Sequence, residues 1–118
     1  MGLFDSLFSA AKSGMNKAAE AGIVSRFTEM SNTTIEQLEN IIKMKQGTGI
    51  MSSLAMIFLN LKAGQYRTLE CLRQNDILPS NANASVKRLL SMDNILLSQD
   101  PKIEHLRTIG NKFLEDIK

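Results

Sequence analysis

The sequence has little of what catalysis or metal binding needs: one cysteine, one histidine and no tryptophan. A single cysteine, Cys71, excludes an intrachain disulfide and favours a reducing compartment. Cys71 has no histidine near it in sequence, and His105 lies opposite the apolar stripe of its own segment. No His/Cys/Asp group has metal-ligand spacing. We therefore expect a protein that is not an enzyme and that holds no metal or cofactor.

Long hydrophobic runs are also missing. The longest uninterrupted apolar stretch, residues 54–59, is far shorter than the roughly 20 residues of a membrane span. The first residues lack the basic stretch of a secretory signal. They do fit the loose myristoylation pattern at Gly2, which matters only if the chain meets a eukaryotic transferase. We expect a cytoplasmic protein, with a peripheral position at a membrane as the alternative.

Strand signals are rare, because few β-branched residues alternate with period two. Every apolar segment instead repeats with helical spacing. Two N-terminal cap signals stand out: Thr33 or Thr34 with Glu36 or Gln37 three residues on, and Asp100 followed by Pro101. The sequence therefore predicts an all-α fold, a small four- to five-helix bundle preceded by an N-terminal amphipathic helical arm.

The longest predicted helix covers residues 50–74, and its first half is apolar nearly all round. Such a helix is either central to its own bundle or buried by a partner. We predict core or interface positions at Leu54, Ile57, Phe58 and Leu61. A loop is predicted over residues 75–83, and a short helix from about Ala84.

The arm, residues 1–20, is the most informative segment. Its apolar face reverses after residue 20, so we expect a helix break at Ala21-Gly22 and two parts, 1–20 and 21–118. The arm either packs on its own bundle or docks elsewhere. Its polar face is neutral, so docking would rest on apolar side chains. The candidate partner- or membrane-docking residues are Leu3, Phe4, Leu7, Phe8 and Met15.

Charge is placed unevenly along a chain whose formal net charge is +2. Residues 43–88 hold seven lysines and arginines against two acidic residues. A phosphate-binding face normally concentrates more charge than this, so nucleic acid is a weak candidate partner. The residues that would make such contacts, in the basic 62–88 region, are Lys62, Tyr66, Arg73, Lys87 and Arg88.

These features favour a non-enzymatic helical interaction module that self-associates or docks on a protein partner. Met51, Met56 and Leu59 lie off the main apolar line of the 50–74 helix, and methionine is an adaptable contact residue. We expect them to mediate self-association into a homo-oligomer. The first alternative is a peripheral membrane protein that inserts residues 1–20 into the bilayer interface. The second is a small nucleic-acid-binding subunit. The sequence indicates no small-molecule substrate.

Overall fold

The structure is a computed structural model that describes residues 20–118. Throughout this range every regular element is a helix and no strand is present, so the predicted all-α class is confirmed. Residues 20–31 form the first described helix. The helices that follow are α2 (Ile35–Lys45), α3 (Gly49–Ala63), α4 (Gln65–Gln74), α5 (Pro79–Leu90), α6 (Asp93–Leu96) and α7 (Pro101–Asp116).

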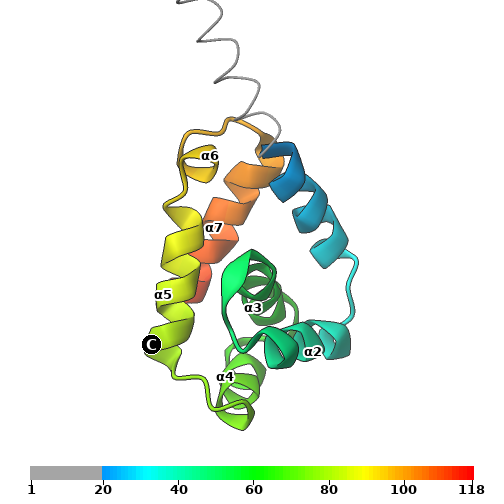
Figure 1. The fold of residues 1–118 in the computed structure, drawn as a ribbon, viewed down its shortest axis with the longest axis vertical. Helices are drawn as coiled ribbons and strands as arrows, with labels where there is room; N and C mark the ends of the chain where they lie inside the picture. The colour runs from blue at the N-terminus through cyan, green and yellow to red at the C-terminus, as the bar shows by residue number, and fades with distance from the viewer. Residues whose placement is uncertain (1–19) are drawn as a thin grey trace, which may run out of the picture.

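Helix α3 lies at the centre of the fold (Figure 1). All residues from 52 to 60 are buried, as an apolar surface on every side requires. Helices α2, α4, α5 and α7 pack against it. On a further side, Phe27 of helix 20–31 meets Phe58 edge to face, with 5.1 Å between the ring centroids. The central helix is therefore buried by its own chain.

Three of the four residues predicted to be core or interface positions are buried in the core. Leu54, Ile57 and Phe58 are buried, whereas Leu61 is 42% exposed. Leu61 lies in the last turn of α3, just beyond the continuous buried stretch of residues 52–60. The core therefore ends before the helix does.

The single helix predicted over residues 50–74 is wrong, because the chain breaks at Gly64 between α3 and α4. Gly64 has φ +94° and ψ 171°, a backbone conformation that only glycine adopts without strain. The helical spacing of apolar residues continues across Gly64, so this spacing alone does not indicate that a helix ends there.

The cap signals are confirmed, but two other boundaries are not. Thr34 and Gln37 form a reciprocal capping box, and the Asp100 side chain accepts from the Lys102 amide at 2.8 Å. Helix α5 begins at Pro79, not near Ala84. Proline is favoured in the first turn of a helix, so Pro79 marks the start of α5 and does not belong to the predicted loop.

The expected break at Ala21-Gly22 is also absent, because residues 20–31 form one uninterrupted helix. An isolated glycine inside a helix costs only about 1 kcal/mol relative to alanine, which packing elsewhere offsets. Of the predicted arm, all but Glu20 lies outside the described residues.

Side-chain hydrogen bonds tie the helices around α3 into one unit. The Lys62 ammonium donates to the carbonyls of Met30, Ser31 and Thr33 at 3.3, 2.7 and 2.7 Å, and so caps the end of helix 20–31. Asn60, which is 4% exposed, donates to the Asp116 carboxylate at 2.9 Å. These bonds attach the C-terminal half of α3 to the first and last described helices.

Two glycines provide a matched test of this fold. Gly64→Ala should lower the free energy of unfolding by about 1–3 kcal/mol, because alanine is strained at this backbone conformation. Gly22→Ala should raise it by about 0.5–1 kcal/mol, because Gly22 lies inside a helix and an added Cβ makes only an ordinary contact. Urea denaturation of both variants measures the difference. Equal effects at the two sites would contradict the assigned break.

Candidate binding surfaces

An apolar cleft opens where α4 ends and α5 begins. Its volume is about 490 Å³. We call it the α4–α5 cleft, and its lining residues are Leu69, Leu72, Arg73, Asp76, Ile77, Leu78 and Pro79. The turn between the helices passes through Asp76 in a left-handed conformation, with φ 57°. Ile77 is buried beyond it, while Leu78 remains 62% exposed.

Helix α4 extends this apolar surface away from the cleft. Tyr66, Leu69 and Arg73 are spaced i, i+3 and i+7, so they share one side of the helix. Tyr66 is 86% exposed. Tyrosine and arginine are enriched at the energetic centres of protein interfaces. The α4–α5 cleft therefore has the exposed Leu78 in its lining, and the exposed Tyr66 lies about one turn before Leu69 on the same side of α4.

The charges beside the cleft are largely paired. The Arg73 guanidinium donates through two nitrogens to the Glu70 carboxylate, and the hydrogen bonds from Arg73 lower the pKa of Glu70. Asp76 adds one further negative charge to the lining. The cleft therefore has no large charge of either sign to attract an ionic ligand.

A second exposed apolar feature is the α6 tip, Leu96 and Leu97, which are 53% and 76% exposed. The Arg107 side chain holds the backbone beneath them. Its guanidinium donates to the carbonyls of Ile95, Leu96 and Ser98 at 2.6, 3.1 and 3.0 Å. Charge-assisted bonds of this kind are among the stronger hydrogen bonds in proteins. They fix a short segment whose two adjacent leucines face solvent.

The two apolar features lie at opposite ends of α7. The α6 tip is bound to the first half of α7 through Arg107. Helix 20–31 lies at that end as well, because Lys102 donates to the Thr28 hydroxyl at 2.8 Å. At the other end, Gln65 donates to the Asp116 carbonyl at 2.8 Å and Asn83 donates to the Ile117 carbonyl. Figure 1 shows the described chain beginning near α6, with α4 at the far end.

The residues predicted to mediate self-association are mostly internal. Met56 and Leu59 are fully buried in the core around α3 and are not available to a second copy in this fold. Met51 is half-buried. The predicted docking residues Leu3, Phe4, Leu7, Phe8 and Met15 lie outside the described residues. Exposed large apolar side chains are found instead at other positions: Met44, Leu61, Tyr66, Leu78, Leu96 and Leu97.

The residues predicted to contact nucleic acid do not form one surface. Lys62 is engaged by three carbonyls and Arg73 by Glu70. Arg88 lies beside Gly49, the first residue of α3, whereas Lys62 is near its last, roughly 20 Å along the helix. Lys62 and Arg88 therefore lie in different parts of the fold, although both belong to the basic 62–88 region.

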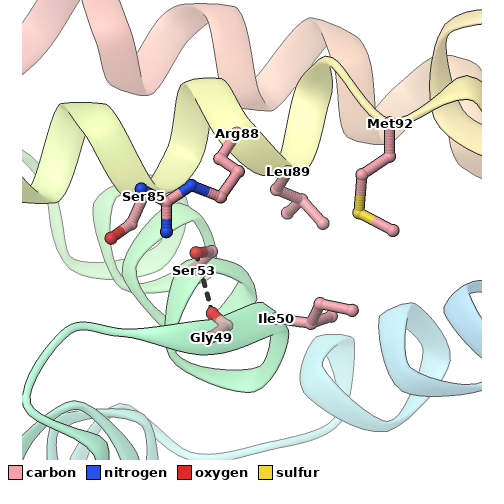
Figure 2. A pocket seen from close by; sticks show the side chains of 7 residues that line it. All are labelled: Gly49, Ile50, Ser53, Ser85, Arg88, Leu89 and Met92. Atoms are coloured by element: carbon pink, nitrogen blue, oxygen red, sulfur yellow. Dashed lines mark hydrogen bonds between the residues drawn. The ribbon is translucent and has the colours of Figure 1, made fainter.

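Arg88 lines a small pocket between α3 and α5 (Figure 2). The pocket measures about 90 Å³, well below the 300–1,000 Å³ typical of ligand sites. Its two hydroxyls are already bonded within the protein, because Ser53 donates to the Gly49 carbonyl and Ser85 to the Gly47 carbonyl, both at 2.9 Å. The pocket is a packing gap with room for little more than water.

The two residues first considered for catalysis occupy structural positions. His105 is exposed, and its ring lies edge-on to Phe27 with 5.8 Å between centroids. Cys71 is 2% exposed, and burial raises the pKa of its thiol. A raised pKa keeps the thiol protonated and unreactive at neutral pH.

Within residues 20–118, no group of three or more His, Cys, Asp or Glu side chains is placed to hold a metal ion. No helix in the same range is long and apolar enough to cross a membrane. Comparison with protein-family models, curated proteins and solved structures finds no match. The exposed surfaces of the described residues are therefore the features that bear on function.

The protection of Cys71 can be tested directly. Its thiol should react with a disulfide reagent at pH 8 at least about tenfold more slowly than a free cysteine, because burial reduces both access and thiolate content. The rate should reach that of free cysteine in denaturant. A native-state rate equal to that of free cysteine would place Cys71 at the surface.

Proposed function

We propose that this protein is a non-enzymatic helical module that self-associates through apolar surfaces at its two ends. The observation that carries the proposal is the α4–α5 cleft, which has the exposed Leu78 in its lining, with the exposed Tyr66 about one turn before Leu69 on α4. Exposure of a concave apolar surface to water is unfavourable. Covering it with a complementary apolar surface lowers the free energy. Neutralised charges beside the cleft favour an apolar occupant over an ionic one.

The α6 tip supports docking at the opposite end. Arg107 uses its guanidinium to hold a segment that presents Leu96 and Leu97 to solvent. Two adjacent exposed leucines on a fixed backbone lose little conformational entropy when they bind. The end that carries them is also the end at which residues 1–19 join the described chain.

The end that carries the α6 tip also supports a second candidate function, docking on a membrane. Figure 1 shows α6, which carries the exposed Leu96, at the end of the molecule where the described chain begins. The preceding sequence contains Leu3, Phe4, Leu7 and Phe8, and apolar side chains of this kind suit insertion into a bilayer interface. Nucleic-acid binding has no comparable support, because the basic residues are dispersed. We place the protein in the cytoplasm, with the membrane surface as the alternative.

Sedimentation velocity over a concentration series tests the leading proposal. The average mass should rise above that of the 13.1 kDa chain as the concentration increases through the micromolar range. Flotation with neutral phosphatidylcholine vesicles is the companion measurement. A single monomeric species at every concentration that floats with vesicles would favour the membrane alternative. A monomer that does not float would contradict both.

A further inference from the structure

We propose that two copies of this chain pair through α4 about a two-fold axis, with Tyr66 of each copy lying in the α4–α5 cleft of the other. The inference rests on the proposed self-association and specifies the contact made at the α4 end of the molecule. Both contacting parts, the tyrosine and the cleft, lie within the described residues.

One side of α4 carries both a projecting side chain and the cleft. Tyr66 and Arg73 are spaced i and i+7, so they share this side and lie about 10 Å apart along the helix axis. Tyr66 is 86% exposed, whereas Leu72 in the cleft lining is buried. The tyrosine therefore projects at the first turn of α4, and the cleft opens at its last turn.

A helix side with a projection at one end and a hollow at the other is complementary to itself. An antiparallel pair of α4 helices, related by a two-fold axis near Leu69 and Glu70, places Tyr66 of one copy opposite Arg73 of the other. The same rotation places the second Tyr66 opposite the second Arg73, so one arrangement fills both clefts. Each ring then contacts the apolar lining and lies beside an arginine, with which aromatic rings make favourable cation–π contacts.

The charges around this side of α4 also match in the antiparallel pair. Asp76 follows the end of α4, so it comes beside the first turn of α4 in the other copy. That turn begins at Gly64 and has neither a side-chain cap nor an acidic residue, so a negative charge beside it is favourable. Glu70 comes close to its own copy at the axis. The two carboxylates repel one another little, because each is already paired with Arg73 of its own chain.

Coverage of the exposed apolar residues favours a second copy over a small ligand. The pair covers both Tyr66 and Leu78, whose exposed fractions are 86% and 62%. A small ligand in the cleft would leave Tyr66 in water, because the cleft lining begins at Leu69. The α6 tip lies at the opposite end of each copy, so this pairing leaves it uncovered.

The Leu97→Ser chain isolates the contact at α4, because Leu97 is the more exposed residue of the α6 tip. In sedimentation velocity, its average mass should rise with concentration to twice the 13.1 kDa chain mass and no further. A two-fold pair stops at this mass because both clefts are filled.

Two substitutions made in the Leu97→Ser chain separate the contacting parts. Tyr66→Asp alters the projection. Leu78→Asp alters the cleft and suits the fold, because Leu78 is the N-cap of α5 and aspartate is a favoured N-cap. Each should weaken association at least about tenfold, because both contacts of the pair lose a buried apolar side chain. Met44→Glu is the matched control and should leave association unchanged, since Met44 is 71% exposed on α2 and outside the cleft lining.

Mixing the Tyr66→Asp and Leu78→Asp chains tests whether the contact is reciprocal. In a mixed pair, the intact tyrosine of the Leu78→Asp chain meets the intact cleft of the Tyr66→Asp chain, so one of the two contacts is restored. The mixture should therefore associate more strongly than either variant alone. Native mass spectrometry should show more mixed dimer than random pairing gives.

The opposite outcomes overturn the inference, and they leave the proposed function standing if the parent chain associates. A Leu97→Ser chain that stays monomeric shows that association uses the α6 tip, and one that grows beyond a dimer shows a contact that is not two-fold. If Leu78→Asp weakens association and Tyr66→Asp does not, another segment fills the cleft. A Met44→Glu effect of equal size, or a mixture no stronger than its components, also contradicts the pairing. A parent chain that is monomeric at every concentration overturns the inference and the proposed function together.

Discussion

The burial of α3 on every side is the constraint from which the rest of the structure follows. Residues 52–60 make two and a half turns of helix with no side left for solvent, so neighbours must surround them. Helix 20–31, α2, α4, α5 and α7 do so. These helices are short, and they cover the middle of α3 more completely than its two ends. Large apolar side chains are exposed outside this buried stretch: Met44 on α2, Leu61 at the end of α3, Tyr66 on α4, Leu78 before α5, and Leu96 and Leu97 at the α6 tip.

Polar groups on and beside α3 fix how its neighbours are arranged. Asn60 lies inside the buried stretch and donates to Asp116, and this bond together with Lys112 holds the pKa of the Asp116 carboxyl below its ordinary value. Lys62, two residues further on, holds the end of helix 20–31. A purely apolar α3 would permit several rotations of the helices around it. Directional bonds at its C-terminal end select one of them.

Much of the fold could be predicted from local sequence, because helical period and capping are local properties. Thr34, Asp100 and the all-round apolarity of α3 each indicated what the structure contains. The break at Gly64 could not be found this way, since its neighbours keep the apolar spacing of a continuous helix. The placement of Met56 and Leu59 could not be decided either, because a side chain off the main stripe is exposed only if no further helix covers it.

The α4–α5 cleft was missed for a related reason. Pro79 signals a helix start in the first turn of α5, and that start brings Leu78 and Ile77 beside Leu69 and Leu72 of α4. Leu78 falls within the loop predicted over residues 75–83, yet it lines the cleft. A cleft between two helices depends on their relative placement, which no periodicity within either helix encodes.

The central claim is that α3 is covered by its own chain and not by a partner. Hydrogen exchange of the amides of residues 54–60, measured at concentrations where the chain is monomeric, tests it most directly. We predict that these amides exchange only through global unfolding and that their protection does not depend on protein concentration. Rapid exchange in the monomer, with protection gained only on association, would show that a partner buries α3 and would contradict the account.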